Sequence, residues 1–147
     1  MIAVQRCAIP VVLAAALALA GCGLTGESRP TNYYLLEPIQ PTAERPSGGV
    51  VRLALEPVTI PGYLDRQDIV TRGSGNELQV AGFHRWAEPL EINVTRVLAE
   101  NLRLLLDSTD VILLPARTED FGAELQVEVI RFERTIDGPV TLVARWE

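Results

Sequence analysis

Thiols and imidazoles are scarce in this sequence, and lysine is absent. It contains two cysteines and one histidine, and all 13 of its basic residues are arginine. Structural zinc sites are built from clustered Cys and His side chains, so this composition argues against a metal centre. Both cysteines, Cys7 and Cys22, lie near the amino terminus. The rest of the chain therefore has no disulfide and must be held together by its hydrophobic core.

Positive charge is also in short supply. The chain carries 19 acidic residues against 13 basic ones, for a net charge of −6. Nucleic-acid binding requires a basic face, so we expect no nucleic-acid partner. The sequence contains no GxxxxGK[ST], and Gly73-Ser74-Gly75 is typical of a turn. A nucleotide site, which a transport ATPase would need, is therefore not expected.

The first 21 residues have the pattern of a secretory signal peptide. Arg6 precedes an apolar run at 7–20, which is shorter than the roughly 20 residues that a comfortable membrane span needs. The run ends in Leu-Ala-Gly-Cys, which resembles a bacterial lipobox and implies cleavage before Cys22 and acylation of that residue. Gly23 in the next position resembles an outer-membrane address. An ordinary signal peptide with an incidental cysteine is the alternative.

Three regions follow from this pattern. We expect the signal peptide at 1–21, a lipidated N-terminus and polar tether at 22–32, and a single α/β domain at 33–147. Strands are expected at 33–36, 50–58, 68–72, 77–80, 111–114, 123–136 and 140–146. The chain stops at the end of such sheet-like sequence, so the domain is expected to be cut short, with its last strand as an exposed edge.

One amphipathic helix is predicted, beginning near Pro89. Its expected core face consists of Leu90, Val94, Val97, Leu98, Leu102 and Leu105. Asn93 is assigned to the opposite, polar face. The preceding segment, 83–86, is interpreted as a separate aromatic and charged approach to the helix.

Several strands carry finer expectations. Residues 50–58 alternate, so Leu53 and Leu55 should point one way while Ala54 and Glu56 point the other. The apolar run at 111–114 predicts burial on both faces. The apolar set changes face within 123–136, which indicates a bulge or a strand leaving the sheet. Asp137-Gly138 then predicts a hairpin turn.

Catalytic chemistry has little support in the residues. The single histidine, His84, has no nucleophile motif near it. Two carboxylate pairs are better explained as a turn and a helix N-terminus: Asp65 with Asp68, and Glu88 with Glu91. We therefore predict no catalytic residue, no cofactor and no metal. An envelope hydrolase and a purely structural envelope lipoprotein remain as alternatives.

Candidate partner-contact residues are Tyr63, Arg66, Arg85 and Trp86, because Trp, Tyr and Arg are enriched at binding hot spots. Core packing of Trp86 and Phe83 is the alternative interpretation.

Five motifs lie in an order that resembles the PqiC family of ABC-type transport auxiliary lipoproteins. They are YYLL at 33–36, IPGYLDR at 60–66, IVTR at 69–72, RWAEPL at 85–90 and RVLAENL at 96–102. The resemblance implies a mixed sheet with packed helices, similar to the N-terminal domain of TolB, and no known catalytic residue. It also implies an outer-membrane lipoprotein facing the periplasm that works with an MCE-domain protein in lipid transport, with self-association possible. Family members usually continue past the last strand with a further strand and a closing helix.

Overall fold

The computed structural model describes residues 29–40, 52–106, 110–116, 120–136 and 138–147. The chain divides into two units, Met1–Pro30 and Thr31–Glu147, and all of the secondary structure described below belongs to the second. The predicted signal peptide at 1–21 and the predicted lipidation site Cys22 lie outside the described residues.

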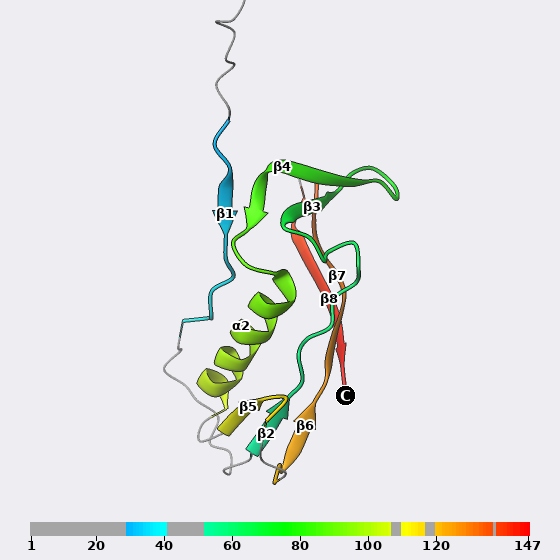
Figure 1. The fold of residues 1–147 in the computed structure, drawn as a ribbon. Coiled ribbons are helices and arrows are strands. Elements are labelled where there is room, and N and C mark those ends of the chain that lie inside the picture. The colour runs from blue at the N-terminus through cyan, green and yellow to red at the C-terminus, as the bar shows by residue number, and fades with distance from the viewer. Residues whose placement is uncertain (1–28, 41–51, 107–109, 117–119, 137) are drawn as a thin grey trace, which may run out of the picture. The chain divides into compact units, whose positions relative to one another are not determined.

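The larger sheet has five strands and mixed direction (Figure 1). In spatial order the strands are β1 (Asn32–Tyr34), β4 (Leu78–Trp86), β3 (Asp68–Arg72), β7 (Val127–Thr135) and β8 (Val140–Trp146). β3 pairs with β4 and β7 with β8 as antiparallel hairpins, whereas the β1–β4 and β3–β7 pairs are parallel. The predicted turn after β3 is confirmed, and Gly75 adopts φ +62°, a conformation that favours glycine. The mixed sheet was correctly predicted.

A second, smaller sheet has three parallel strands in the order β5 (Asp110–Leu113), β2 (Arg52–Leu55) and β6 (Ala123–Leu125). Ala54 and Leu55, which the alternation predicted to point opposite ways, are both fully buried. β2 is the central strand, and central parallel strands are covered on both faces. The predicted burial of β5 on both faces is wrong, since it is an edge strand and Leu113 is 39% exposed.

The long strand expected at 123–136 is two strands that belong to different sheets. Gln126 separates β6 from β7, and its backbone exchanges two hydrogen bonds with Glu147. A register shift between Val129 and Arg131 marks a bulge in the β7–β8 pair. Both outcomes that the change of face predicted, a bulge and a departure from the sheet, are therefore confirmed. The β7–β8 hairpin is confirmed as well, although Asp137 lies outside the described residues.

Helix α2 (Leu90–Leu105) is the one helix in the described part of the chain, where the resemblance implied several. Pro89 is its N-cap rather than a residue of its first turn. Leu90 and Val97 are buried as predicted, whereas Leu105 is exposed at the end of the helix. No helix among the described residues is long and apolar enough to cross a membrane. The likeness to the TolB domain stays a prediction.

Asn93 corrects the predicted polar face of α2. Its side chain is fully buried, and its Oδ1 accepts a hydrogen bond from the Leu36 N–H at 3.1 Å. Thr95, two residues further along α2, forms a second polar contact. Its Oγ1 accepts a hydrogen bond from the Val58 N–H at 2.9 Å and donates one to the Glu91 carbonyl at 2.7 Å. Polar side chains thus join α2 to the chain segments that follow β1 and β2.

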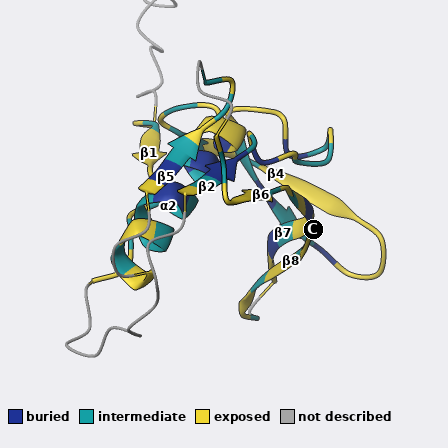
Figure 2. Cartoon of the chain, turned by 90° about the horizontal axis from the view of Figure 1, so that it is seen from below, coloured by how far each residue is buried: buried dark blue, intermediate teal, exposed yellow. Residues whose placement is uncertain are grey.

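Two buried clusters form the core. One joins α2 to the larger sheet through Leu90, Val70 and Val129. The other joins α2 to the smaller sheet through Ala99 and Leu55. Figure 2 shows the buried residues gathered where α2 lies against β2, while most of β4 is exposed. α2 therefore serves as the packing surface for both sheets.

Candidate interaction site

Strands β1 and β4 meet at one edge of the larger sheet, where aromatic side chains are exposed. β1 pairs in parallel with the end of β4, so that Tyr33 lies opposite Arg85 and Tyr34 opposite Trp86. The segment 83–86 is therefore the end of a strand and not a separate approach to the helix, which corrects that interpretation. Tyr33 is 62% exposed. The Tyr34 hydroxyl lies 2.7 Å from His84 Nδ1, and both side chains face solvent.

Arg85 and Trp86 are half-buried, and each has a structural contact. Arg85 Nε donates to Asp68 Oδ1 at 3.0 Å, which ties β4 to β3. The Trp86 ring stacks on Phe132 with centroids 6.2 Å apart. Core packing, the alternative stated for Trp86, accounts for its ring, but Arg85 keeps 40% of its side chain exposed. Their role as partner contacts stays a prediction.

Tyr63 and Arg66 lie in the turn that precedes β3. The Leu64 N–H donates to the Pro61 carbonyl at 2.8 Å, which closes this turn. Arg66 is exposed to solvent, whereas Tyr63 is half-buried and turned toward the larger sheet. The next residue, Gln67, accepts the Trp86 N–H at 2.7 Å. Arg66 is thereby brought beside the Arg85–Trp86 end of β4.

Tyr63 takes part in a buried polar network centred on Glu133 of β7. The Tyr63 hydroxyl donates to Glu133 Oε2 at 2.7 Å, and Arg72 of β3 donates to Glu133 Oε1. Burial alone would raise the pKa of Glu133, but the hydrogen bonds from Arg72 and Tyr63 outweigh it and hold that pKa below its ordinary value. Burial and the Glu133 carboxylate both raise the pKa of Tyr63. The network therefore joins β3 to β7 with Glu133 charged and Tyr63 neutral.

One carboxylate of each pair considered for catalysis has a structural partner. Asp68 binds Arg85, and Glu88 Oε1 accepts a hydrogen bond from Arg96 at 2.8 Å. The described residues contain no group of three or more His, Cys, Asp or Glu side chains that could hold a metal ion. These contacts agree with the prediction that neither carboxylate pair is an acid–base couple.

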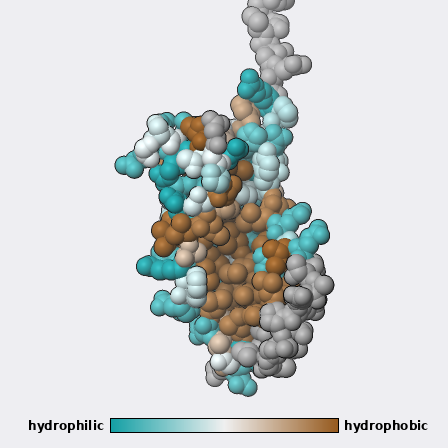
Figure 3. Space-filling model, turned by 180° about the vertical axis from the view of Figure 1, so that it is seen from behind, coloured by the Kyte–Doolittle hydropathy of each residue, from teal (hydrophilic) through white to brown (hydrophobic). Residues whose placement is uncertain are grey.

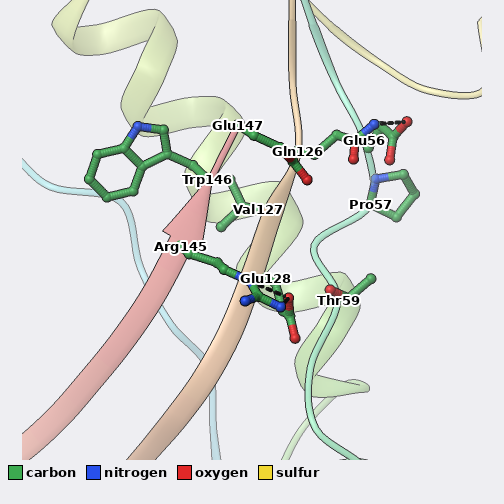
Figure 4. A pocket seen from close by; sticks show the side chains of 9 residues that line it. All are labelled: Glu56, Pro57, Thr59, Gln126, Val127, Glu128, Arg145, Trp146 and Glu147. Carbon is green, nitrogen blue, oxygen red and sulfur yellow. Dashed lines mark hydrogen bonds and ion pairs between the residues drawn. The ribbon is translucent and has the colours of Figure 1, made fainter.

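A cavity of about 330 Å³ lies where β6, β7 and β8 meet the segment after β2 (Figure 4). Two polar contacts lie in its lining: Arg145 Nη2 lies 2.6 Å from Glu128 Oε2, and Gln126 Nε2 donates to Glu56 Oε1 at 3.0 Å. Trp146 points away from the Arg145–Glu128 pair. The cavity lining includes no cysteine, serine or histidine, and its one side-chain hydroxyl belongs to Thr59.

Apolar surface is more prominent than any polar site. Several side chains that pack against the core are only partly buried, namely Val94, Leu98, Leu102, Val127 and Phe132. Figure 3 shows a broad hydrophobic area on the face of the molecule opposite to that in Figure 1. Extended apolar areas on a soluble domain mark sites of protein or lipid contact. The arrangement favours binding over chemistry.

Tyr33 and His84 are exposed at this edge but were not among the contact residues chosen from the sequence. Tyr33 was assigned to a strand, and His84 was considered only as a catalytic base. The available signal was their position: Tyr33 begins the domain immediately after the predicted tether, where a short edge strand leaves side chains open to solvent.

Comparison with known proteins identifies relatives along nearly the whole domain. A family described as the ABC-type transport auxiliary lipoprotein component matches residues 33–147. The intermembrane transport lipoprotein PqiC of Escherichia coli (strain K12) is 34% identical over 137 residues, which cover 92% of this chain and 71% of the relative. PqiC of Shigella flexneri matches with the same identity and coverage.

Two solved structures share the fold. A crystal structure of an uncharacterized protein has a TM-score of 0.64 and 26% identity, over 80% of this chain and 69% of its own. The crystal structure of protein XCC0632 from Xanthomonas campestris has a TM-score of 0.59 and 18% identity, over 80% of this chain and 75% of its own, and shows the fold alone. With the family match extending over the whole domain and PqiC as a relative, this chain belongs to the family of ABC-type transport auxiliary lipoprotein components.

Proposed function

We propose that this protein is a non-enzymatic, outer-membrane-anchored subunit of a PqiC-like intermembrane lipid transport system, and that it contributes to the integrity of the envelope. The observation that carries the proposal is the family match over 33–147, which follows a lipobox-like Leu-Ala-Gly-Cys at 19–22 and a polar stretch. The curated relatives are named for intermembrane transport and as lipoproteins.

In this proposal the membrane is contacted through lipid on Cys22. Each buried CH₂ of an acyl chain contributes about 0.8 kcal/mol, and stable anchoring takes two or more chains. Acylation of both the thiol and the new amino terminus would supply them. The polar stretch at 22–32 would then hold the domain away from the membrane surface, within reach of a partner in the periplasm.

The partner in this proposal is an MCE-domain protein of the same transport system. The surface best suited to it is the β1–β4 edge together with the adjoining turn, where Tyr33, His84 and Arg66 are exposed and Arg85 is half-exposed. Aromatic and arginine side chains at the same edge are typical of interface hot spots. Asp68 and Glu88, one carboxylate from each pair weighed for catalysis, are engaged in ion pairs, which supports a docking role over a hydrolytic one.

A genetic complementation experiment tests this role. We expect a deletion strain to have a more permeable outer membrane, measured as uptake of a hydrophobic dye, and the wild-type gene to restore the barrier. The Cys22→Ser gene should fail to restore it, because its product cannot be acylated at that residue. A variant with Asp65 and Glu88 replaced by Asn and Gln, which leaves the named residues of the β1–β4 edge unchanged, should complement if docking is the function, and should fail if these carboxylates serve a hydrolase. A deletion strain with normal permeability would refute the proposal and favour a purely structural lipoprotein.

A further inference from the structure

The chain leaves one edge of β7 for a short interval and returns to it at β3. Thr59 pairs with the beginning of β7: its N–H donates to the Val127 carbonyl at 3.1 Å, and its carbonyl accepts the Val129 N–H at 2.8 Å. β3 pairs with the end of β7, from Arg134 onward, and β8 occupies the other edge. Among the described residues no strand pairs with the middle of β7 on the side of β3, and the loop 60–67 spans this gap.

Tyr63 reaches into the gap from the loop. Its hydroxyl donates to Glu133 Oε2 at 2.7 Å and is also hydrogen-bonded to the Phe132 backbone. Both of these residues belong to the middle of β7, where the neighbouring strand is missing. The tyrosine hydroxyl thus supplies polar contacts that a strand supplies elsewhere in the sheet, which matters because buried polar groups must be paired.

Glu133 joins the loop to β3 at the same point. Its side chain is buried, so its charge requires partners. Its Oε2 accepts from Tyr63, and its Oε1 accepts from Arg72 of β3. Removing the Tyr63 hydroxyl would therefore leave one oxygen of a buried carboxylate without this donor. The carboxylate holds the middle of the loop to the sheet.

The position of Arg66 depends on this attachment. Leu64, which lies between Tyr63 and Arg66, is 3% exposed and belongs to the core cluster. The Arg66 N–H donates to the Leu64 carbonyl at 2.8 Å, a tight turn that takes the chain from the core to the solvent. The next residue, Gln67, accepts the Trp86 N–H. Arg66 is therefore fixed from both sides beside the end of β4.

We infer that Tyr63 is a positioning residue for the partner contact, and that it acts through Arg66 without touching the partner itself. Its hydroxyl is occupied by Glu133, and its ring packs half-buried against the core cluster. The inference rests on the proposed docking role, in which the exposed Arg66 belongs to the contact surface. Within that role Tyr63 supports the surface and does not form part of it.

Hydrogen exchange tests the attachment of the loop without any partner. Tyr63→Phe keeps the ring and removes the hydroxyl, so the amides of 60–66 should exchange about tenfold faster in the full-length chain in mild detergent. Arg103→Leu is the matched control, because it removes a hydrogen bond that joins α2 to the Val111 carbonyl of β5 and leaves the loop contacts in place. It should not change exchange in the loop. Unchanged exchange in Tyr63→Phe would overturn the inference, because the hydroxyl would then not hold the loop.

Recovery of the partner tests whether Tyr63 acts through Arg66. In affinity purification from native envelopes, Arg66→Ala should lower the recovery of an MCE-domain protein about fivefold, and Tyr63→Phe should lower it by a smaller factor. The double variant should recover as much as Arg66→Ala alone, because Tyr63 has no effect once the side chain that it positions is gone. A direct contact by Tyr63 would instead multiply the two losses.

Multiplied losses in the double variant, or no loss in Tyr63→Phe, would overturn the inference. Recovery of no MCE-domain protein by the wild-type chain would refute the docking role, and with it the role given to Arg66. That failure is distinguishable from a failure of the attachment, because the exchange experiment measures the loop in the protein alone.

Discussion

Thr95 offers a sharp test of how α2 is joined to the rest of the domain. Its hydroxyl accepts the Val58 N–H at 2.9 Å, and Val58 is fully buried. Val58 precedes Thr59, which bridges to Glu128 of β7, so this hydrogen bond fixes the segment that passes from the smaller sheet to the larger one. Thr95→Val keeps the shape of the side chain and removes the acceptor. The Val58 N–H is then left buried without a partner.

The expected cost follows from that unpaired donor. Leaving a buried N–H unsatisfied lowers the free energy of unfolding by about 1–3 kcal/mol. For a domain of this size, each kcal/mol lowers the melting temperature by roughly 3–6 °C. Urea unfolding followed by circular dichroism, with the protein in mild detergent, measures the change. The urea midpoint should fall while the dependence of the free energy on urea stays constant, because the amount of surface exposed on unfolding is unchanged.

Thr95→Ser is the matched control. It retains the hydroxyl and loses one methyl group, which contributes about 0.8 kcal/mol when buried. We therefore expect the valine variant to be less stable than the serine variant. The reverse order would show that methyl packing, and not the hydrogen bond to Val58, holds the helix to this segment.

Three further predictions concern the anchor, the buried carboxylate and the aromatic stack. Cys22→Ser should move the protein from the membrane pellet to the supernatant after alkaline extraction, and persistent pelleting would count against acylation. Folding lowers the pKa of Glu133 below its ordinary value of 4.5, so the charged carboxylate stabilises the folded state at any pH above the pKa of the unfolded chain. This stabilisation is lost as the pH falls through the lower pKa of the folded state. Glu133→Gln should remove this loss, so urea midpoints measured from about pH 6 down to about pH 3 should fall less steeply than in the wild type; parallel curves would contradict the assignment. Trp86→Ala should lower the free energy of unfolding by about 2–3 kcal/mol because the stack on Phe132 is lost, and Trp86→Phe should recover most of it; equal stability of both variants would argue against the stack.

Local sequence patterns were sufficient where neighbouring residues decide the structure. β3 and β8 have the predicted bounds, and α2 begins immediately after Pro89. In each case the signal is a short-range one: alternation between turn residues for the strands, and a proline followed by spaced leucines for the helix.

Long-range pairing decided the features that the sequence pattern did not show. Ala54 is buried because β2 lies between two parallel neighbours, and nothing in its own alternation indicates that position. Asn93 is buried because Leu36, distant in sequence, presents an N–H to its amide oxygen. The sequence pattern of β6 and β7 is that of one continuous strand, and only the structure shows that the chain crosses from one sheet to the other at Gln126. Each of these depends on contacts between distant segments.

For the candidate contact residues, too, the sequence supplied the residue types and the fold supplied their surroundings. Residue type suggested Tyr63 and Trp86, but the structure uses the Tyr63 hydroxyl to bind Glu133 and the Trp86 ring to cover Phe132. Arg66 is exposed to solvent in the turn before β3. Tyr33 could be recognised only once β1 was found at the edge of the sheet. Residue type alone therefore does not identify a binding surface. The exposure of each side chain must also be known, and only the fold provides it.

Docking to an MCE-domain protein is the central claim, and affinity purification from native envelopes tests it most directly. The acylated wild-type chain, solubilised in mild detergent, should recover an MCE-domain protein that mass spectrometry identifies. Arg66→Glu reverses the charge of one exposed residue of the proposed contact surface and should reduce that recovery, whereas the same change at Arg103, exposed on α2, should not. Recovery of no MCE-domain protein by the wild-type chain would contradict the account.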